Sequence, residues 1–158
     1  MLEVGCNLGA NLRWIASGVA PGPVWGVDVN LHALQRLRRA VPGVRPVAAA
    51  ALGLPFGDRA FDLVFTVGVL IHQPPAVLPA VMAEIVRCSR RFVLCGEYYA
   101  DEPTEIPYRG QTGALFKRDF GGLYQKLFPR LALRKQAFQS RAAGWDDVTF
   151  WRFEKVRA

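Results

Sequence analysis

A glycine-containing turn near the N-terminus is the first feature that could do chemistry. It follows a short apolar run that contains Glu3 and reads Gly5-Cys6-Asn7-Leu8-Gly9. Glycine lets the backbone turn tightly and approach a ligand closely, and a helix after the turn would present free amide groups and a positive dipole end. The turn therefore predicts a binding site for an anionic group at Gly5 and Gly9. Glu3, Cys6 and Asn7 lie beside them and are further candidate ligand-binding residues.

An acid closes the next apolar run, where Asp28 precedes Val29. A carboxylate at the end of a second strand can accept hydrogen bonds from both hydroxyls of a ribose. Combined with the glycine turn, Asp28 and Val29 indicate a nucleoside-type ligand. The alternative is a tight connection between strand and helix in which Asp28 caps the helix that starts at Leu31.

Two residues are candidates for a general base. His72 and Glu97 each follow or end an apolar run that reads as a strand. Histidine is the side chain that most readily exchanges a proton near neutral pH, and a carboxylate can serve the same purpose. Both also have structural alternatives: His72 could cap a helix or fill the sheet edge, and Glu97 could orient Arg109 or cap a turn.

Aromatic and cationic residues gather after the strand that ends near Glu97. A polar excursion over residues 100–113 looks like a binding loop or lid. An arginine there can clamp a carboxylate or phosphate in a bidentate fork, which favours an anionic acceptor molecule, although a solvated loop arginine is the alternative. The candidate substrate-binding residues are Tyr98, Tyr99, Tyr108, Arg109, Lys117 and Arg118.

Strands and helices alternate along the chain that carries these residues. We expect strands at residues 2–4, 24–29, 44–47, 61–67 and 92–97, and helices at residues 8–17, 31–40 and 76–88, with mixed helix and loop over 115–128. In the second helix, Leu31, Leu34 and Leu37 recur on one face. Residues 131–138 and 148–154 read as two strands with no helix between them, which favours an antiparallel pair. The pattern predicts an α/β, doubly wound sheet.

The chain resembles the class I S-adenosylmethionine-dependent methyltransferases. Leu2-Glu3-Val4-Gly5-Cys6-Asn7-Leu8-Gly9 is similar to their first motif, Gly26-Val27-Asp28 to their ribose acid, and Leu54-Pro55-Phe56 with Phe61-Asp62-Leu63-Val64 to their later motifs. Further blocks resemble a narrower group, the methylases associated with pseudaminic acid biosynthesis. These blocks are Phe65-Thr66-Val67-Gly68-Val69-Leu70-Ile71-His72, Gly96-Glu97-Tyr98-Tyr99, Glu105-Ile106-Pro107-Tyr108-Arg109-Gly110 and Leu115-Phe116-Lys117-Arg118-Asp119-Phe120.

This resemblance implies a Rossmann-like sheet with the strand order 3-2-1-4-5-7-6 and S-adenosylmethionine as the cofactor. It also implies methyl transfer to a small, anionic, sugar-like acceptor, with oxygen as the favoured methylated atom, and adds Thr66 to the cofactor-binding residues. Asn7 stands where many relatives have a further glycine. The alanine run ending at Ala51 supplies no side-chain acceptor for adenine, so we expect the backbone amides of Ala51 and Leu52 to hold the base.

Length and composition limit the other possibilities. The 158 residues, 51% of them hydrophobic, predict one globular domain over residues 1–158, and no apolar run is long enough to cross a bilayer. With no secretory signal visible, we expect a cytoplasmic protein that starts inside its first strand, so that its N-terminal cover is truncated or its site is open. Three cysteines without a CxxC pair and two histidines predict reduced thiols and no metal site.

The net charge of +7 favours an anionic ligand. The basic residues are scattered without interleaved aromatic residues, which argues against nucleic acid as the partner, although a nucleic-acid-modifying enzyme stays open as a third hypothesis. The leading hypothesis is a methyltransferase for a small-molecule acceptor. The second hypothesis is a remnant that binds S-adenosylmethionine or a partner protein without catalysing a reaction.

Overall fold

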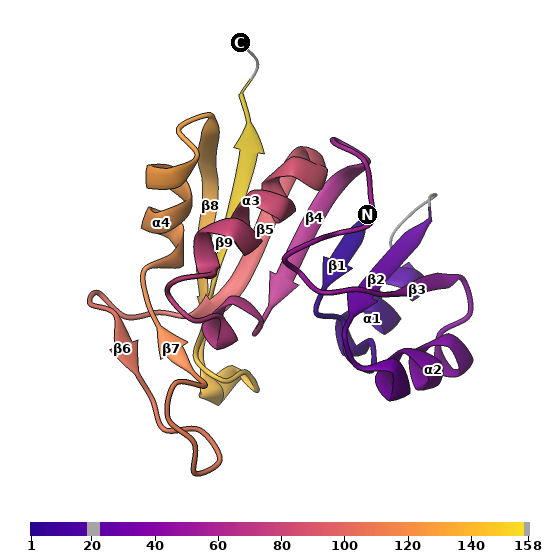
Figure 1. The fold of residues 1–158 in the computed structure, drawn as a ribbon, viewed down its shortest axis with the longest axis horizontal. Helices are drawn as coiled ribbons and strands as arrows, with labels where there is room; N and C mark the ends of the chain where they lie inside the picture. Colours follow the sequence, from indigo (N-terminus) through magenta and orange to yellow (C-terminus); the bar gives the residue numbers. More distant parts are fainter. Residues whose placement is uncertain (19–22, 157–158) are drawn as a thin grey trace.

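The computed structural model describes residues 1–18 and 23–156 (Figure 1). The strands are β1 (Leu2–Val4), β2 (Val24–Asp28), β3 (Val44–Ala48), β4 (Phe61–Val67), β5 (Ser89–Tyr98), β6 (Thr104–Glu105), β7 (Phe116–Lys117), β8 (Leu131–Gln139) and β9 (Val148–Lys155). The α-helices are α1 (Ala10–Gly18), α2 (Leu31–Ala40), α3 (Leu78–Cys88) and α4 (Phe120–Leu127), and two single 3₁₀ turns are η1 (Leu70–His72) and η2 (Arg141–Ala143).

Seven strands form one sheet in the order β3-β2-β1-β4-β5-β9-β8. Strands β1 to β5 pair in parallel, whereas β9 pairs antiparallel with both β5 and β8. This order confirms the predicted Rossmann-like arrangement with its final antiparallel pair; the labels differ because the short hairpin β6–β7 comes before the last two strands. The carboxyl ends of the parallel strands meet at one edge of the sheet, and the β6–β7 hairpin lies beside the carboxyl end of β5 (Figure 1).

Alternation along the strands divides the core between the two faces of the sheet. In β4, Val64 belongs to a cluster with α3 and α4, whereas Phe65 belongs to a second cluster with α1 and α2. Successive side chains of a strand point to opposite faces, so a strand covered on both sides reads as a continuous apolar run. The packing therefore leaves the carboxyl edge of the sheet, and the loops that follow it, to form a site.

Helix α2 differs from its prediction in one residue. Asn30 caps the helix, since its side-chain oxygen accepts a hydrogen bond from the amide of Ala33 at 3.1 Å. Leu34 and Leu37 are buried as expected, but Leu31 is 61% exposed, so its placement on the core face was wrong. Leu31 is the first residue of the helix, where the chain has just left the sheet edge, and its side chain lies beyond the contact between helix and sheet.

Other boundaries moved by a few residues. The helix expected over 76–88 starts two residues later, at Leu78 of α3, after the two prolines at positions 74 and 75. The 3₁₀ turn η1, which precedes these prolines, was not predicted. Strand β5 begins at Ser89, directly after α3, rather than at residue 92. Within residues 1–18 and 23–156, no helix is both long and apolar enough to span a membrane, and no three metal-binding side chains come together.

Candidate functional site

The glycine turn between β1 and α1 has the close backbone approach that its sequence predicts. Gly5 and Gly9 both have φ of +77°, and a Cβ atom at either would collide with a side chain, that of Val69 at Gly5 and that of Leu37 at Gly9. Asn7 also lies in the left-handed region, with φ of 45°. Asparagine tolerates this conformation better than most residues. Asn7 therefore preserves the turn where a further glycine was expected.

Asp28 fastens this turn to the end of β2. One carboxylate oxygen accepts a hydrogen bond from the backbone amide of Asn7 at 2.8 Å, and the other accepts one from the amide of Asn30 at 2.8 Å. The amide of Gly5 donates to the carbonyl of Val27 at 2.7 Å, next to the same point. Asp28 is thus not the helix cap, because Asn30 has that role. Each of its oxygens retains a lone pair for a further donor.

Glu3 places a buried carboxylate under the turn. It is 1% exposed, and its Oε1 accepts a hydrogen bond from the side chain of Asn11 at 2.7 Å. Burial raises the pKa of Glu3 to about 7, and the hydrogen bond from Asn11 opposes this shift. Among the described residues, Glu3 Oε2 is buried without a hydrogen-bond partner. An unsatisfied buried oxygen costs about 1–3 kcal/mol, so this atom is suited to a donor from a ligand.

Apolar side chains surround the same edge without being buried. Leu8, Val29 and Leu52 follow β1, β2 and β3, and they are 43%, 71% and 50% exposed. In the described part of the chain, the backbone amides of Ala51 and Leu52 donate no hydrogen bond. Exposed apolar surface beside free amides matches the needs of a flat heterocyclic base.

His72 stands at the end of η1, after the carboxyl end of β4. Its Nδ1 lies 2.6 Å from the backbone carbonyl oxygen of Ala114. A carbonyl only accepts hydrogen bonds, so Nδ1 carries the proton and Nε2 of the neutral ring keeps its lone pair. The His72 side chain is exposed. The structure therefore presents an accessible proton acceptor whose tautomer is fixed.

Glu97 takes the structural alternative that the sequence left open. It is completely buried, and its carboxylate accepts hydrogen bonds from the hydroxyl of Thr66 at 3.0 Å and from the amides of Val69 at 3.3 Å and Ile71 at 3.2 Å. These contacts cap the turn that leads to His72. The expected roles of Glu97 as a base and of Thr66 as a cofactor contact do not match these positions, because Thr66 is 0% exposed as well. Glu97 acts as a positioning residue for η1.

The burial of Glu97 leads to a testable dependence of stability on pH. Burial raises the pKa of Glu97 to about 7 from 4.5, so the folded state retains its proton at a pH where the unfolded chain has released it. The free energy of unfolding should therefore fall as the pH rises from about 4.5 to about 7 and level off above that range. Glu3 contributes in the same direction, because its pKa is also raised to about 7.

Glu97→Gln should reduce this fall, since glutamine does not titrate. Urea unfolding at about pH 5 and about pH 8 measures the difference for each variant. Glu102→Gln, which removes an exposed carboxylate, is the matched control and should keep the dependence of the unmodified chain. An unchanged pH dependence in Glu97→Gln would show that this carboxyl does not titrate with folding.

Tyr108 lies beside His72, and Arg109 beside Tyr108, in a tight hairpin of the polar excursion. Tyr108 and Gln111 pair with each other through two backbone hydrogen bonds of 2.9 Å, and Arg109 and Gly110 form the turn with φ of 51° and 76°. The rings of Tyr108 and His72 lie 5.2 Å apart, and the Arg109 guanidinium lies 5.2 Å from the Tyr108 ring centre. The structure thus brings these three predicted residues together.

The other predicted substrate-binding residues have different contacts and do not lie together. The Lys117 ammonium lies 6.0 Å from the Tyr98 ring centre, so these two are neighbours. Tyr99 is exposed and donates its hydroxyl proton to Asp101 at 2.5 Å. Arg118, the residue after β7, is only 5% exposed and its guanidinium lies over the ring of Phe116, whereas Lys117 lies near Tyr98. The predicted substrate-binding residues therefore do not form a single cluster.

The three cysteines are buried thiols. Burial raises the pKa of Cys6 to about 12, with smaller contributions from the nearby charges of Glu3 and Asp28. Burial likewise raises the pKa values of Cys88 and Cys95. A thiol that stays protonated is a poor nucleophile. Cys6 can therefore line the turn through its backbone, and its side chain fills space beneath Gly26.

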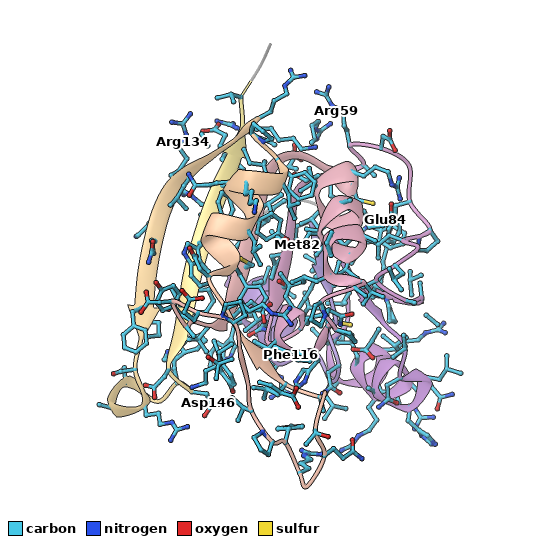
Figure 2. All side chains as sticks on the ribbon, turned by 60° about the vertical axis from the view of Figure 1, so that its left-hand side comes forward. Arg59, Met82, Glu84, Phe116, Arg134 and Asp146 are labelled. Atoms are coloured by element: carbon cyan, nitrogen blue, oxygen red, sulfur yellow. The ribbon has the colours of Figure 1, made fainter. Side chains whose placement is uncertain are left out.

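A hollow lies at the opposite edge of the sheet, where β4 and β5 begin. Its volume is about 1310 Å³, and Arg59 and Arg134 mark its place near the top of Figure 2. Other arginines of its wall are already paired with acids, as Arg90 is with Asp62. In open α/β sheets, ligands bind beyond the carboxyl ends of the strands. We therefore place the functional site at the glycine turn and His72 rather than in this hollow.

Comparison with known proteins identifies the family of the chain. Residues 1–91 match the sequence profile of a family described as a methyltransferase domain. The match covers more than half of the chain. The chain belongs to the methyltransferase-domain family. The matched residues contain the glycine turn, Asp28 and His72.

Curated relatives of this methyltransferase domain match it in part of their length. A phthiotriol/phenolphthiotriol dimycocerosates methyltransferase from Mycobacterium leprae is 29% identical over 92 residues, which are 57% of this chain and 33% of the relative. A fatty-acid O-methyltransferase from Mycolicibacterium smegmatis is 35% identical over 69 residues, which are 42% of this chain and 25% of the relative. The chain spans about a third or less of the length of these relatives.

The methyltransferase domain also shares its fold with solved structures. A 1,6-didemethyltoxoflavin-N1-methyltransferase from Burkholderia thailandensis, solved with 1,6-didemethyltoxoflavin and S-adenosylhomocysteine, has a TM-score of 0.79 and 20% identity. The superposition covers 99% of this chain and 70% of that one. At this identity, the likeness shows the fold.

Several residues of the methyltransferase domain escaped the sequence analysis. Asn11 holds Glu3, Asn30 caps α2, and the carbonyl of Ala114 fixes the tautomer of His72. The position of Asn11, eight residues after Glu3 on the first turn of a predicted helix, was a visible signal. The contact with Ala114 was not, because 42 residues separate the two partners.

Proposed function

We propose that this methyltransferase domain transfers a methyl group from S-adenosylmethionine to an oxygen atom of a small, anionic, sugar-like acceptor. The observation that carries the proposal is the glycine turn fastened to Asp28 above the unpartnered buried oxygen of Glu3. Family membership supports the reaction class. The whole of residues 1–158 would form one such domain.

The residues at the carboxyl edge fit this cofactor. Its amino acid portion carries a carboxylate and an ammonium group, which suit the amides of the turn and the free oxygen of Glu3, respectively. Its ribose would donate hydroxyl protons to Asp28. Its adenine would contact Val29 and Leu52 and accept hydrogen bonds from free backbone amides. The amino acid portion, the ribose and the adenine of the cofactor would thus each meet a group of matching chemistry.

When bound, S-adenosylmethionine supplies a methyl group activated by a positively charged sulfur. The residues of the chain then have to align the acceptor and remove its proton. Nε2 of His72 accepts the proton of the acceptor hydroxyl, while Nδ1–H stays hydrogen-bonded to Ala114 and stabilises the charged ring. Glu97 holds η1, and with it His72, at the end of β4.

The anionic character of the acceptor is inferred from the Tyr108–Arg109 turn. Arg109 offers a planar fork for a carboxylate or phosphate, and Tyr108 offers an aromatic wall beside His72. Lys117 adds a second cation near Tyr98. The sugar-like character rests on the resemblance of these blocks to the pseudaminic acid-associated methylases.

A transfer assay tests the proposal directly. The purified chain, incubated with methyl-labelled S-adenosylmethionine and a panel of sugar acids, sugar phosphates and neutral sugars, should yield a labelled anionic product that mass spectrometry detects. Calorimetry with the cofactor is the parallel measurement. Cofactor binding without transfer to any acceptor would favour a binding protein over an enzyme, and loss of both would reject the site.

Arg109→Ala should weaken use of the acceptor found in that assay. Loss of a charge-assisted bidentate contact costs about 1.5–3 kcal/mol in kcat/KM, and Arg109→Lys should restore only part of it. The left-handed backbone at this turn strains alanine and arginine alike, so the substitution should leave the hairpin about as stable as in the unmodified chain.

The affinity for S-adenosylmethionine should barely change in Arg109→Ala, because Arg109 lies on the hairpin rather than on the glycine turn. Arg141→Ala, which removes an exposed arginine in η2, is the matched control. Equal damage to cofactor binding, or an unchanged acceptor affinity, would make the hairpin a structural cover instead of a recognition element.

A further inference from the structure

An apolar groove lies between α3 and α4, on the face of the sheet that Figure 2 shows. Its volume is about 390 Å³. Met82 lies on the side of α3 toward α4, and Phe116 of β7 lies below it (Figure 2). Most of the wall is apolar, and it consists of Pro75, Leu78, Pro79, Met82, Pro103, Glu105, Phe116, Arg118, Leu123 and Leu127.

Arg118 places a buried cation in this groove. The residue is 5% exposed, and its guanidinium lies over the ring of Phe116 at 4.5 Å from the ring centre. One nitrogen donates to the carbonyl of Gln73 at 3.3 Å, and that is the one hydrogen bond of this side chain within residues 1–18 and 23–156. A guanidinium has five N–H donors, so most of its capacity remains free.

Arg118 also lacks an anionic partner in the described part of the chain. The acid of the groove wall, Glu105, is not within ion-pair distance of it, and Glu105 instead accepts a hydrogen bond from the amide of Gly113 at 2.5 Å. Burying a charge without a counterion is unfavourable, and none of the Arg118 nitrogens is among the buried atoms without a partner in the described residues, so an anion in the groove can reach the free N–H groups. Desolvation lowers the pKa of Arg118, in agreement with this burial.

Apolar walls and a single buried cation together define the chemistry of a ligand. We propose that the groove binds an anionic amphiphile, with its alkyl chain between α3 and α4 and its carboxylate or phosphate head paired with Arg118. The alkyl chain covers the exposed part of Leu127 and the partly buried Leu123. The head lies beside Gln73, one residue after His72, which places the amphiphile next to the candidate site.

The inference concerns binding and is independent of the proposed reaction. Dodecanoate and dodecanol, titrated calorimetrically below the concentrations at which they form micelles, share a chain and differ in the charge of the head. The unmodified chain should bind dodecanoate about tenfold or more tightly than dodecanol, since a buried charge-assisted pair is lost with the alcohol. Equal affinities, or no binding of either, would overturn the proposal.

Three variants separate the head from the chain of the ligand. Arg118→Gln should remove the preference for dodecanoate and leave the affinity for dodecanol unchanged. Leu127→Glu, at a partly exposed position of the wall, should weaken both ligands. Lys126→Gln removes an exposed cation of α4 outside the groove and should alter neither.

A loss of dodecanoate preference in Lys126→Gln as large as in Arg118→Gln would show general attraction to a basic surface and would contradict the inference. Thermal melting of each variant establishes that it folds. Should Arg118→Gln fail to fold, two results decide: the ratio of the two affinities in the unmodified chain, and the weaker binding of both ligands in Leu127→Glu. S-adenosylmethionine affinity, measured on the same samples, should be unchanged and reports separately on the proposed function.

Discussion

His72→Ala should lower kcat by about 10²–10⁴, because a positioned general base contributes that much to a proton transfer. The fixed tautomer is the physical reason: the carbonyl of Ala114 holds the proton on Nδ1 and leaves Nε2 free to accept another. The affinity for S-adenosylmethionine should stay within about twofold of the original, since η1 follows β4 and the glycine turn follows β1. Single-turnover kinetics with labelled cofactor measures the effect.

His32→Ala is the matched control for this experiment. His32 is an exposed histidine of α2, so its removal should leave turnover unchanged. His72→Gln tests the hydrogen bond separately, because a glutamine amide can still donate to a carbonyl but accepts no proton. Full turnover in both His72 variants would mean that alignment of the acceptor alone drives the reaction.

Asp28→Ala should weaken binding of S-adenosylmethionine and of its demethylated product. Loss of hydrogen bonds to two ribose hydroxyls costs about 1–3 kcal/mol, which raises Kd by about five- to 150-fold. The substitution also frees the amides of Asn7 and Asn30, so the turn loses its fastening to β2. Isothermal calorimetry on both ligands gives the two constants.

Asp62→Ala provides the comparison, because Asp62 is an exposed acid at the start of β4, at the other end of the sheet. Its loss removes a surface ion pair of little energetic value and should leave Kd unchanged. Equal cofactor affinity in Asp28→Ala and the unmodified chain would contradict the proposal that Asp28 binds the ribose.

The strands and the sense of their pairing were predictable because the signals for both are local. Apolar runs in β4 and β5 and the glycine turn after β1 indicate buried parallel strands joined by helices, and the lack of a helix between β8 and β9 indicates the antiparallel pair. The resemblance to methyltransferases supplied the exact order. The short hairpin β6–β7 was not predicted, since two-residue strands carry no periodic pattern.

Burial of individual side chains was harder to predict. Glu97 sits at a strand end in the sequence, where an exposed base and a buried cap look alike, and only the contacts with Thr66 and the amides after β4 distinguish them. Arg118 follows Lys117 directly, yet Lys117 lies near Tyr98 while Arg118 lies over Phe116 and donates to the carbonyl of Gln73. The burial of Glu97 and of Arg118 depends on contacts with residues far away in the sequence, such as Thr66 and Gln73.

The two parts of the candidate site come from different stretches of the chain. The glycine turn, Asp28 and the loop after β3 all precede residue 60, whereas the Tyr108–Arg109 hairpin follows β5. The family match ends at residue 91, before the second stretch begins. Under the proposed function, mutations in the hairpin would change the choice of acceptor without disturbing the loops proposed to hold the cofactor. New acceptor preferences would then arise by exchange of one continuous segment.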